Sequence, residues 1–287
     1  MVLSCRLPVA FPCSIALSHG IARKLRESLW HSSKESSLTK HPSGEAFPLN
    51  LLLLTEKDIR KDGLIQIDGR RAEHIHCILR AEEGDSIRCG MLNGRIGSAK
   101  LLKTERREAL LEFSGPLATP SPEPLKLRFI IALPRPQSFK KTLHFLASSG
   151  IPEVWFIATE RVEKSYWKSS AMNPENIQHE IQLGLEQGGG TIPPRLEFRS
   201  YFRSFAEKEL PLFQKDSRAL IAHPGEKAGI CPHRMKEKVT VAVGPEGGFL
   251  PEEVKAFTDA GFEQVSFGPH ILRVEFAVAF LAGRISE

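Results

Sequence analysis

Residues 239–250 read VTVAVGPEGGFL, a short and mainly apolar run followed by a loop with three glycines and a proline. A run of this length bounded by Gly and Pro is typical of a buried strand in a parallel sheet. Two further runs end in similar loops: Arg218–Ala222 precedes His-Pro-Gly, and Gln264–Phe267 precedes Gly-Pro-His. Ligands of open parallel sheets lie in the loops after the carboxyl ends of the strands. We therefore expect these three loops to form one site.

The same alternation of apolar strand runs and amphipathic helices continues on both sides of this stretch, through residues 119–287. Such alternation predicts an α/β domain with a parallel, doubly wound sheet covered on both faces. The strands are predicted at Leu127–Leu133, Val154–Ala158, Arg195–Phe198, Arg218–Ala222, Val239–Val243 and Gln264–Phe267. The helices are predicted at Ser138–Ser149, Pro174–Gln187, Phe202–Leu210, Pro251–Ala260 and Ile271–Ile285.

Residues 50–118 have a different pattern, with short β-suited runs separated by turn signals such as Asp62-Gly63 and Asn93-Gly94. Even spacing of this kind predicts a small β-barrel, interrupted by one helix over Arg71–Leu79. The expected strands are Leu51–Thr55, Leu64–Ile67, Ser86–Gly90, Arg95–Leu102 and Ala109–Phe113. The proline-rich segment Ala118–Pro124 cannot continue a helix or a central strand, so a domain boundary is predicted there.

The first 49 residues lack a sustained period, contain nine serines and are poor in acids. These features are typical of an organellar transit segment, which would place the protein in a mitochondrion or plastid. The alternative is a non-native extension of a bacterial protein from an upstream start codon. We favour the extension, because Glu27, Glu35 and Glu45 are unusual for a transit peptide, and we expect a cytoplasmic protein.

Composition excludes several classes of protein. The net charge of +5 divides into +3 for residues 1–49, +1 for 50–118 and +1 for 119–287, so no bulk charge favours nucleic acid. Five scattered cysteines form no CxxC pair, which argues against structural zinc, and no metal is expected. No apolar run approaches the roughly 18 residues of a membrane span. The GxGxxG and GxxxxGK[ST] motifs are absent, so NAD and ATP lose support.

Glycine-rich loops with exposed main-chain groups can hold a flat heterocycle by its hydrogen-bonding edge while apolar neighbours cover its face. A nucleoside-type cofactor would fit such a site. A structural interpretation of the loop at 244–248 competes, since a strand that leads into a helix often needs Gly for the turn. Pro251 followed by Glu252 and Glu253 is in itself a good helix start.

Four stretches together carry a resemblance to a known family: Ala-His-Pro at 222–224, Val-Gly-Pro-Glu-Gly-Gly-Phe at 243–249, Phe-Gly-Pro-His-Ile-Leu-Arg-Val-Glu at 267–275 and Glu-Gln-Gly-Gly at 186–189. In this order and spacing they resemble the RsmE family of small-subunit ribosomal RNA methyltransferases, in the SPOUT superfamily. The resemblance covers residues 51–285. Residues Leu51–Phe113 look like the family's N-terminal PUA-like barrel.

The resemblance implies a SPOUT-type trefoil-knotted α/β domain (119–287), preceded by a small PUA-like, RNA-binding β-barrel (50–118). It also implies a homodimer that uses S-adenosyl-L-methionine to methylate N3 of a uridine in 16S ribosomal RNA of the small ribosomal subunit. Carried over by position, the cofactor-binding residues are Ala222, His223, Pro224, Val243, Gly244, Glu246, Gly247, Gly248, Phe267, Gly268, Ile271, Leu272 and Arg273. The chain departs from the family pattern at Leu250, His270 and Phe276, where a Ser or Thr, an Arg and a Thr are usual.

Arg273 and Glu275 are the candidate catalytic residues. Uridine N3 carries a proton, so methyl transfer needs a base or a stabilised uridine anion. Arg273 could stabilise negative charge on a uracil oxygen, and Glu275 could orient Arg273 or accept the proton. Alternatively, the two form a structural ion pair.

Basic side chains at Arg70, Arg71, His74 and Arg80 make a local patch that could contact ribosomal phosphates. A solvated face is the alternative, because Glu73, Glu82 and Glu83 lie nearby in the sequence.

Two functions compete with N3-uridine methylation. One is a SPOUT methyltransferase for another rRNA or tRNA nucleotide, suggested by Phe276 and His270. The other is a catalytically silent RNA-binding assembly factor, against which the three retained glycine loops argue.

Overall fold

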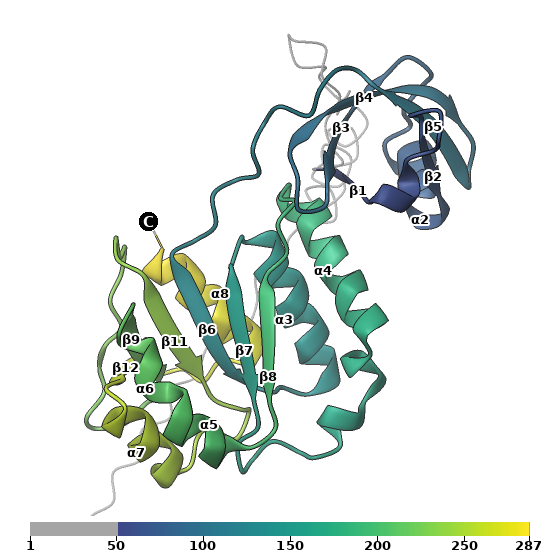
Figure 1. Cartoon of the computed structure of the whole chain (residues 1–287). Coiled ribbons are helices and arrows are strands. Elements are labelled where there is room, and N and C mark those ends of the chain that lie inside the picture. The colour runs from purple at the N-terminus through teal and green to yellow at the C-terminus, as the bar shows by residue number, and fades with distance from the viewer. Residues whose placement is uncertain (1–50, 287) are drawn as a thin grey trace, which may run out of the picture. The chain divides into compact units, whose positions relative to one another are not determined.

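The computed structural model describes residues 51–286. The predicted transit segment or extension, residues 1–49, lies outside the described residues and stays a prediction. The described residues contain two sheets, one with strands from residues 52–113 and the other with strands from residues 127–266 (Figure 1). The proline-rich segment predicted as a linker lies between them in the sequence. No helix within the described range is long and apolar enough to cross a membrane.

The first sheet has five short strands in the order β1-β3-β4-β5-β2. β1 and β3 pair in parallel and the other neighbours are antiparallel, so the sheet is mixed. Its alternating residues bury one face, which includes Leu52, Ile65, Ile67, Leu101 and Leu111. The strands are β1 (Leu52–Leu54), β2 (Ile65–Asp68), β3 (Ser86–Met91), β4 (Ile96–Thr104) and β5 (Glu108–Phe113).

The helix predicted over Arg71–Leu79 is two elements in the structure. A short α-helix, α2 (Gly69–Glu73), continues directly into a π-helical turn, η2 (His74–Ile78). The wider turn places Ile75 in the core and leaves Ile78 exposed. A π-helical turn cannot be recognised from periodicity over one turn, because it inserts a single residue into an α-helical pattern.

The second sheet has seven parallel strands in the order β10-β12-β9-β11-β6-β7-β8. β11 and β6 lie at its centre and read as nearly continuous apolar runs, because both faces of the sheet are covered. The strands are β6 (Leu127–Ala132), β7 (Glu153–Ile157), β8 (Arg195–Arg199), β9 (Arg218–Ala222), β10 (Gly229–Ile230), β11 (Val239–Val243) and β12 (Glu263–Ser266).

Neighbouring residues of β7 show which helices cover which face, since successive strand residues point to opposite faces. Phe156 packs edge-on against Phe139 of α3, whereas Trp155 packs against Phe205 of α5 and Phe213 of α6. α3 also contacts both α4 and α8. The helices are α3 (Pro136–Ser148), α4 (Pro174–Gly188), α5 (Phe202–Lys208), α6 (Leu210–Phe213), α7 (Pro251–Asp259) and α8 (Val274–Ile285). The predicted doubly wound α/β arrangement is present.

Some predicted boundaries are wrong. The last helix begins at Val274 and not at Ile271, because residues 267–273 form a loop and Arg273 has extended backbone before the helix. The short edge strand β10 was not predicted, since Gly229 and Ile230 give too short a signal. α7 begins without a Ser or Thr cap: Leu250 precedes it, and the Glu253 carboxylate accepts the Leu250 N–H at 2.8 Å instead.

Candidate active site

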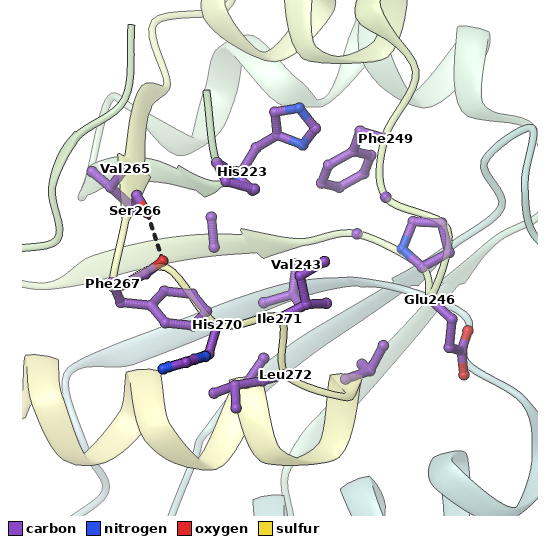
Figure 2. A pocket seen from close by; sticks show the side chains of 18 of the residues that line it. His223, Val243, Glu246, Phe249, Val265, Ser266, Phe267, His270, Ile271 and Leu272 are labelled. Carbon is purple, nitrogen blue, oxygen red and sulfur yellow. Dashed lines mark hydrogen bonds between the residues drawn. The ribbon is translucent and has the colours of Figure 1, made fainter. Parts of the chain in front are cut away.

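The loops that follow β9, β11 and β12 meet at the carboxyl edge of the second sheet and enclose a cavity of about 290 Å³ (Figure 2). This volume is near the lower end for small-molecule sites. Twelve of the thirteen residues expected to bind a cofactor line the cavity: Ala222, His223, Pro224, Val243, Gly244, Glu246, Gly247, Gly248, Phe267, Gly268, Ile271 and Leu272. Arg273, the thirteenth, lies between two lining residues but does not line the cavity itself.

Other lining residues were missed by the sequence analysis. Phe249, Val265 and Ala277 add apolar surface, Ser266 and Val274 also line the walls, and Pro245 and Pro269 of the expected loops line them too. His270, one of the departures from the family pattern, also lines the cavity. The signal for Phe249 was present, because this residue ends the quoted Gly-Gly-Phe motif.

The cavity combines apolar walls with unpaired main-chain donors. Figure 2 shows Val243, Ile271 and Leu272 grouped around the space, while the Glu246 carboxylate points away from it. Within residues 51–286, the N–H groups of Glu246, Gly247 and Ile271 donate to no protein acceptor. Donors beside apolar surface suit the polar edge and the flat face of a heterocycle. The cavity therefore fits the expected nucleoside-type group.

Backbone geometry explains why glycine occupies particular positions here. Gly248 (φ +74°) and Gly268 (φ +141°) adopt conformations that disfavour other residues. Gly244 is needed for another reason, since a Cβ would lie 3.1 Å from the Phe249 ring and 3.2 Å from its backbone nitrogen. The loop is closed by a turn in which the Gly248 N–H donates to the Pro245 carbonyl oxygen at 2.8 Å.

His223 lies at the base of the first loop. Burial lowers the pKa of its imidazole, and the positive charge of Arg161 lowers it further. The imidazole is therefore largely neutral at pH 7. The main chain of His223 is fixed, because its N–H donates to Val265 and its carbonyl oxygen accepts from the Gln264 amide at 3.0 Å.

The two candidate catalytic residues flank the start of α8. Arg273 is exposed, and its guanidinium makes no hydrogen bond or ion pair within residues 51–286. Glu275 is only 6% exposed, and neither carboxylate oxygen has a hydrogen-bond partner in the described part of the chain. In the described residues Arg273 and Glu275 do not form the ion pair that was the structural alternative.

The predicted RNA-binding residues occupy different environments. Arg71 binds Asp58 and the Leu53 carbonyl oxygen, and it is largely buried. Arg70 pairs with the buried Glu186 of α4, near His74, whose buried Nε2 has no partner among residues 51–286. Arg80 is exposed. Of the four, Arg80 and the half-exposed Arg70 present charge to solvent.

No three His, Cys, Asp or Glu side chains within residues 51–286 are grouped to hold a metal ion.

Residues 121–286, more than half of the chain, match the family described as RNA methyltransferase domain. The chain belongs to this family. The expected methyltransferase activity is thereby confirmed, and the expected RsmE membership is confirmed by this match together with the named relatives given next. This RNA methyltransferase has the corresponding α/β fold.

The methyltransferase is similar to several characterised relatives. Ribosomal RNA small subunit methyltransferase E of Treponema pallidum (strain Nichols) is 26% identical over 243 residues, which are 80% of this chain and 87% of the relative. The crystal structure of ribosomal RNA small subunit methyltransferase E from Neisseria gonorrhoeae, bound to S-adenosyl methionine, has a TM-score of 0.60 at 22% identity and covers 81% of this chain and 94% of its own. The structure of Lpg2936 from Legionella pneumophila, also in complex with this cofactor, has a TM-score of 0.63 at 22% identity and covers 82% of this chain and 96% of its own.

Proposed function

We propose that this RNA methyltransferase uses S-adenosyl-L-methionine to methylate N3 of a uridine in 16S ribosomal RNA of the small subunit. The observation that carries the proposal is the convergence of three glycine-containing loops around one cavity with unpaired main-chain donors. The family match and the name of the Treponema relative support the class of substrate. The N3 position and the uridine come from the RsmE family.

The residues that line the cavity would hold the cofactor mainly through the main chain. Glu246, Gly247 and Ile271 offer N–H donors for the edge of the heterocycle, and Val243 and Leu272 cover its face. When bound, the cofactor supplies an electrophilic methyl carbon. The closed turn at Pro245–Gly248 keeps its donors in place before binding, which reduces the entropy lost on association.

Arg273 is suited to act on the nucleotide. Its guanidinium is free of protein partners in the described range, so it can meet an anionic oxygen of the uracil ring as N3 loses its proton. Glu275 is the candidate acceptor for that proton, or the group that aligns Arg273 when RNA is bound. Because Glu275 is buried and does not line the cavity, either role requires a change at the start of α8.

Three further properties of the RsmE family are proposed for this chain. The C-terminal α/β region, residues 119–287, would carry the trefoil knot. The sheet of residues 50–118 would be a PUA-like, RNA-binding barrel, with Arg80 as its best-placed cation. A homodimer would cover the apolar residues exposed around α8, namely Ile271 (91% exposed), Phe276 (57%) and Phe280 (43%).

Isothermal titration of the full-length protein with S-adenosyl-L-methionine tests the cofactor, and mapping of methylated nucleotides in small subunits tests the product. Binding followed by N3 methylation of one uridine is expected. Binding with methylation of a different nucleotide would favour the other SPOUT activity, for which the exposed ring of Phe276 is the supporting observation. Absence of binding at millimolar cofactor would refute the proposal and favour an RNA-binding assembly factor.

A further inference from the structure

The loop Gly244–Leu250 is held by the segment that follows β7, through contacts of Glu160 and Arg161. The Arg161 guanidinium donates a hydrogen bond from Nη1 to the carbonyl oxygen of Gly247. Its aliphatic stem lies close to the same residue, since a Cβ on Gly247 would stand 3.0 Å from Arg161 Cδ. A glycine at 247 therefore leaves room for the Arg161 side chain.

A buried carboxylate ties the end of the loop to the same segment. Glu253 is 4% exposed, and its Oε2 accepts the N–H of Leu250 at 2.8 Å. Its Oε1 accepts the N–H of Glu160 at 2.8 Å, so one side chain joins the start of α7 to the residue before Arg161. Hydrogen bonds to an ionised acceptor are about twice as strong as neutral ones.

These contacts leave main-chain donors of two cavity-lining residues free. Arg161 engages a carbonyl oxygen, and Glu253 engages the N–H of Leu250, so neither uses the N–H of Glu246 or Gly247. The loop is thus fixed through other groups while these two N–H groups remain available. Such an arrangement lowers the cost of ordering a loop when a ligand binds.

Arg161 has no competing structural task in the described part of the chain. Among residues 51–286 it forms no ion pair, and the Gly247 carbonyl oxygen is its hydrogen-bond acceptor. By contrast, Arg203 on α5 is also exposed but pairs with Glu207 in its own helix. Arg161 therefore differs from Arg203, because its polar contact is with the loop at the cavity and not with a side chain of its own helix.

We propose that Arg161 and Glu253 are positioning residues that hold the Gly244–Leu250 loop in the conformation that binds the cofactor. The inference rests on the proposed function, since it assigns these residues to the cofactor side of the site. It predicts that losing Arg161 weakens cofactor binding without unfolding the protein, because Arg161 is exposed and lies outside the core.

Calorimetric titration of the full chain with S-adenosyl-L-methionine tests the proposal with R161Q, R161K and the matched control R203Q. We expect R161Q to raise the Kd about 10-fold, as a lost hydrogen bond to a charged donor in a solvent-accessible position would. R161K keeps a donor and a charge and should recover part of the affinity. R203Q should bind like the wild type, and all four proteins should share one unfolding midpoint. R161Q binding within about two-fold of the wild type would overturn the proposal.

Two ligand-free measurements separate this inference from the proposed function. Arg161 lowers the pKa of His223, so R161Q should raise that pKa in an NMR titration, whereas R161K and R203Q should not. Amide exchange at Gly248, whose N–H donates to the Pro245 carbonyl oxygen, should be faster in R161Q, and E253Q should reproduce this change. A wild-type protein that binds no cofactor would refute the proposed function. Unaltered exchange in R161Q would refute the positioning role whatever the wild type binds.

Discussion

The carboxylate of Glu275 is buried and the guanidinium of Arg273 is exposed, although the two residues are separated by one position at the start of α8. Arg273 precedes the helix with extended backbone, and Glu275 lies in its first turn. No ion pair joins them in the described part of the chain. Arg273 is therefore available to a substrate, whereas Glu275 is a buried carboxyl group without a partner in the described residues.

Replacement of Arg273 should separate catalysis from folding. R273Q removes an exposed side chain without protein partners, so its unfolding midpoint should match that of the wild type. Methyl transfer under single-turnover conditions should fall about 100-fold, the effect of losing one donor to a developing oxyanion. R203Q, an exposed arginine far along the chain on α5, is the control. An unchanged rate in R273Q would leave Arg273 without a catalytic role.

Replacement of Glu275 should stabilise the protein. Glu275→Gln keeps the shape but replaces a buried carboxyl group whose two oxygens have no donor in the described residues. Because a buried ionisable group without a partner is costly, we expect the free energy of unfolding to rise by about 1 kcal/mol. Urea unfolding at pH 7 measures this difference. A loss of stability would contradict the prediction.

Asp216 should make the stability of the second sheet depend on acid pH. Hydrogen bonding from the buried Arg128 guanidinium, with a second bond from Lys238, holds the pKa of Asp216 at about 2, below its ordinary 3.8. A lowered pKa gives stability that is complete above the unfolded value and is lost as the pH falls toward 2. Asp216 is half exposed, so D216N should cost only about 1 kcal/mol at pH 7.

Urea unfolding of D216N and the wild type at pH 7, 4 and 2.5 checks this dependence. The difference between the two proteins should persist at pH 7, shrink below pH 4 and nearly vanish as Asp216 becomes protonated. R203Q is a suitable control, since Arg203 is an exposed arginine of α5 that pairs with Glu207. A difference that stays constant over the whole range would show that the Arg128 contact contributes no pH-dependent stability.

Local signals were sufficient to predict the second sheet. Val239–Val243 was placed correctly because a five-residue apolar run ended by Gly244 and Pro245 leaves few alternatives. The start of α8 was placed too early, since Ile271 and Leu272 continue the apolar pattern of the helix although they belong to a cavity loop. Apolar residues that line a cavity loop and apolar residues of a helix are of the same types, so the sequence does not show where the loop ends and the helix begins.

Contacts between distant segments could not be predicted. Arg71 belongs to a basic stretch, yet its guanidinium lies on Asp58 and the Leu53 carbonyl oxygen because the fold brings these groups together. Arg161 was not singled out at all, since its acceptor is a main-chain oxygen 86 residues away that has no sequence signature. Gly247 was expected among the cofactor-binding residues, but its contact with Arg161, whose Cδ would stand 3.0 Å from a Cβ on this glycine, has no sequence signature.

Gly268 offers the sharpest test of the cavity itself. At φ +141° a valine would be strained, at a cost of about 1–3 kcal/mol, and its Cβ would meet no protein atom within 4 Å although Gly268 lines the cavity. Gly268→Val should therefore lower both the stability and the affinity for S-adenosyl-L-methionine, the latter by more than about 10-fold, or roughly 1.4 kcal/mol. Gly63→Val is the matched control, because Gly63 has φ +82° with the same open surroundings but lies in the first sheet region. Differential scanning calorimetry should show similar destabilisation of both variants, and titration should show a loss of affinity in Gly268→Val alone. Equal affinities would place the ligand outside the cavity formed by these loops.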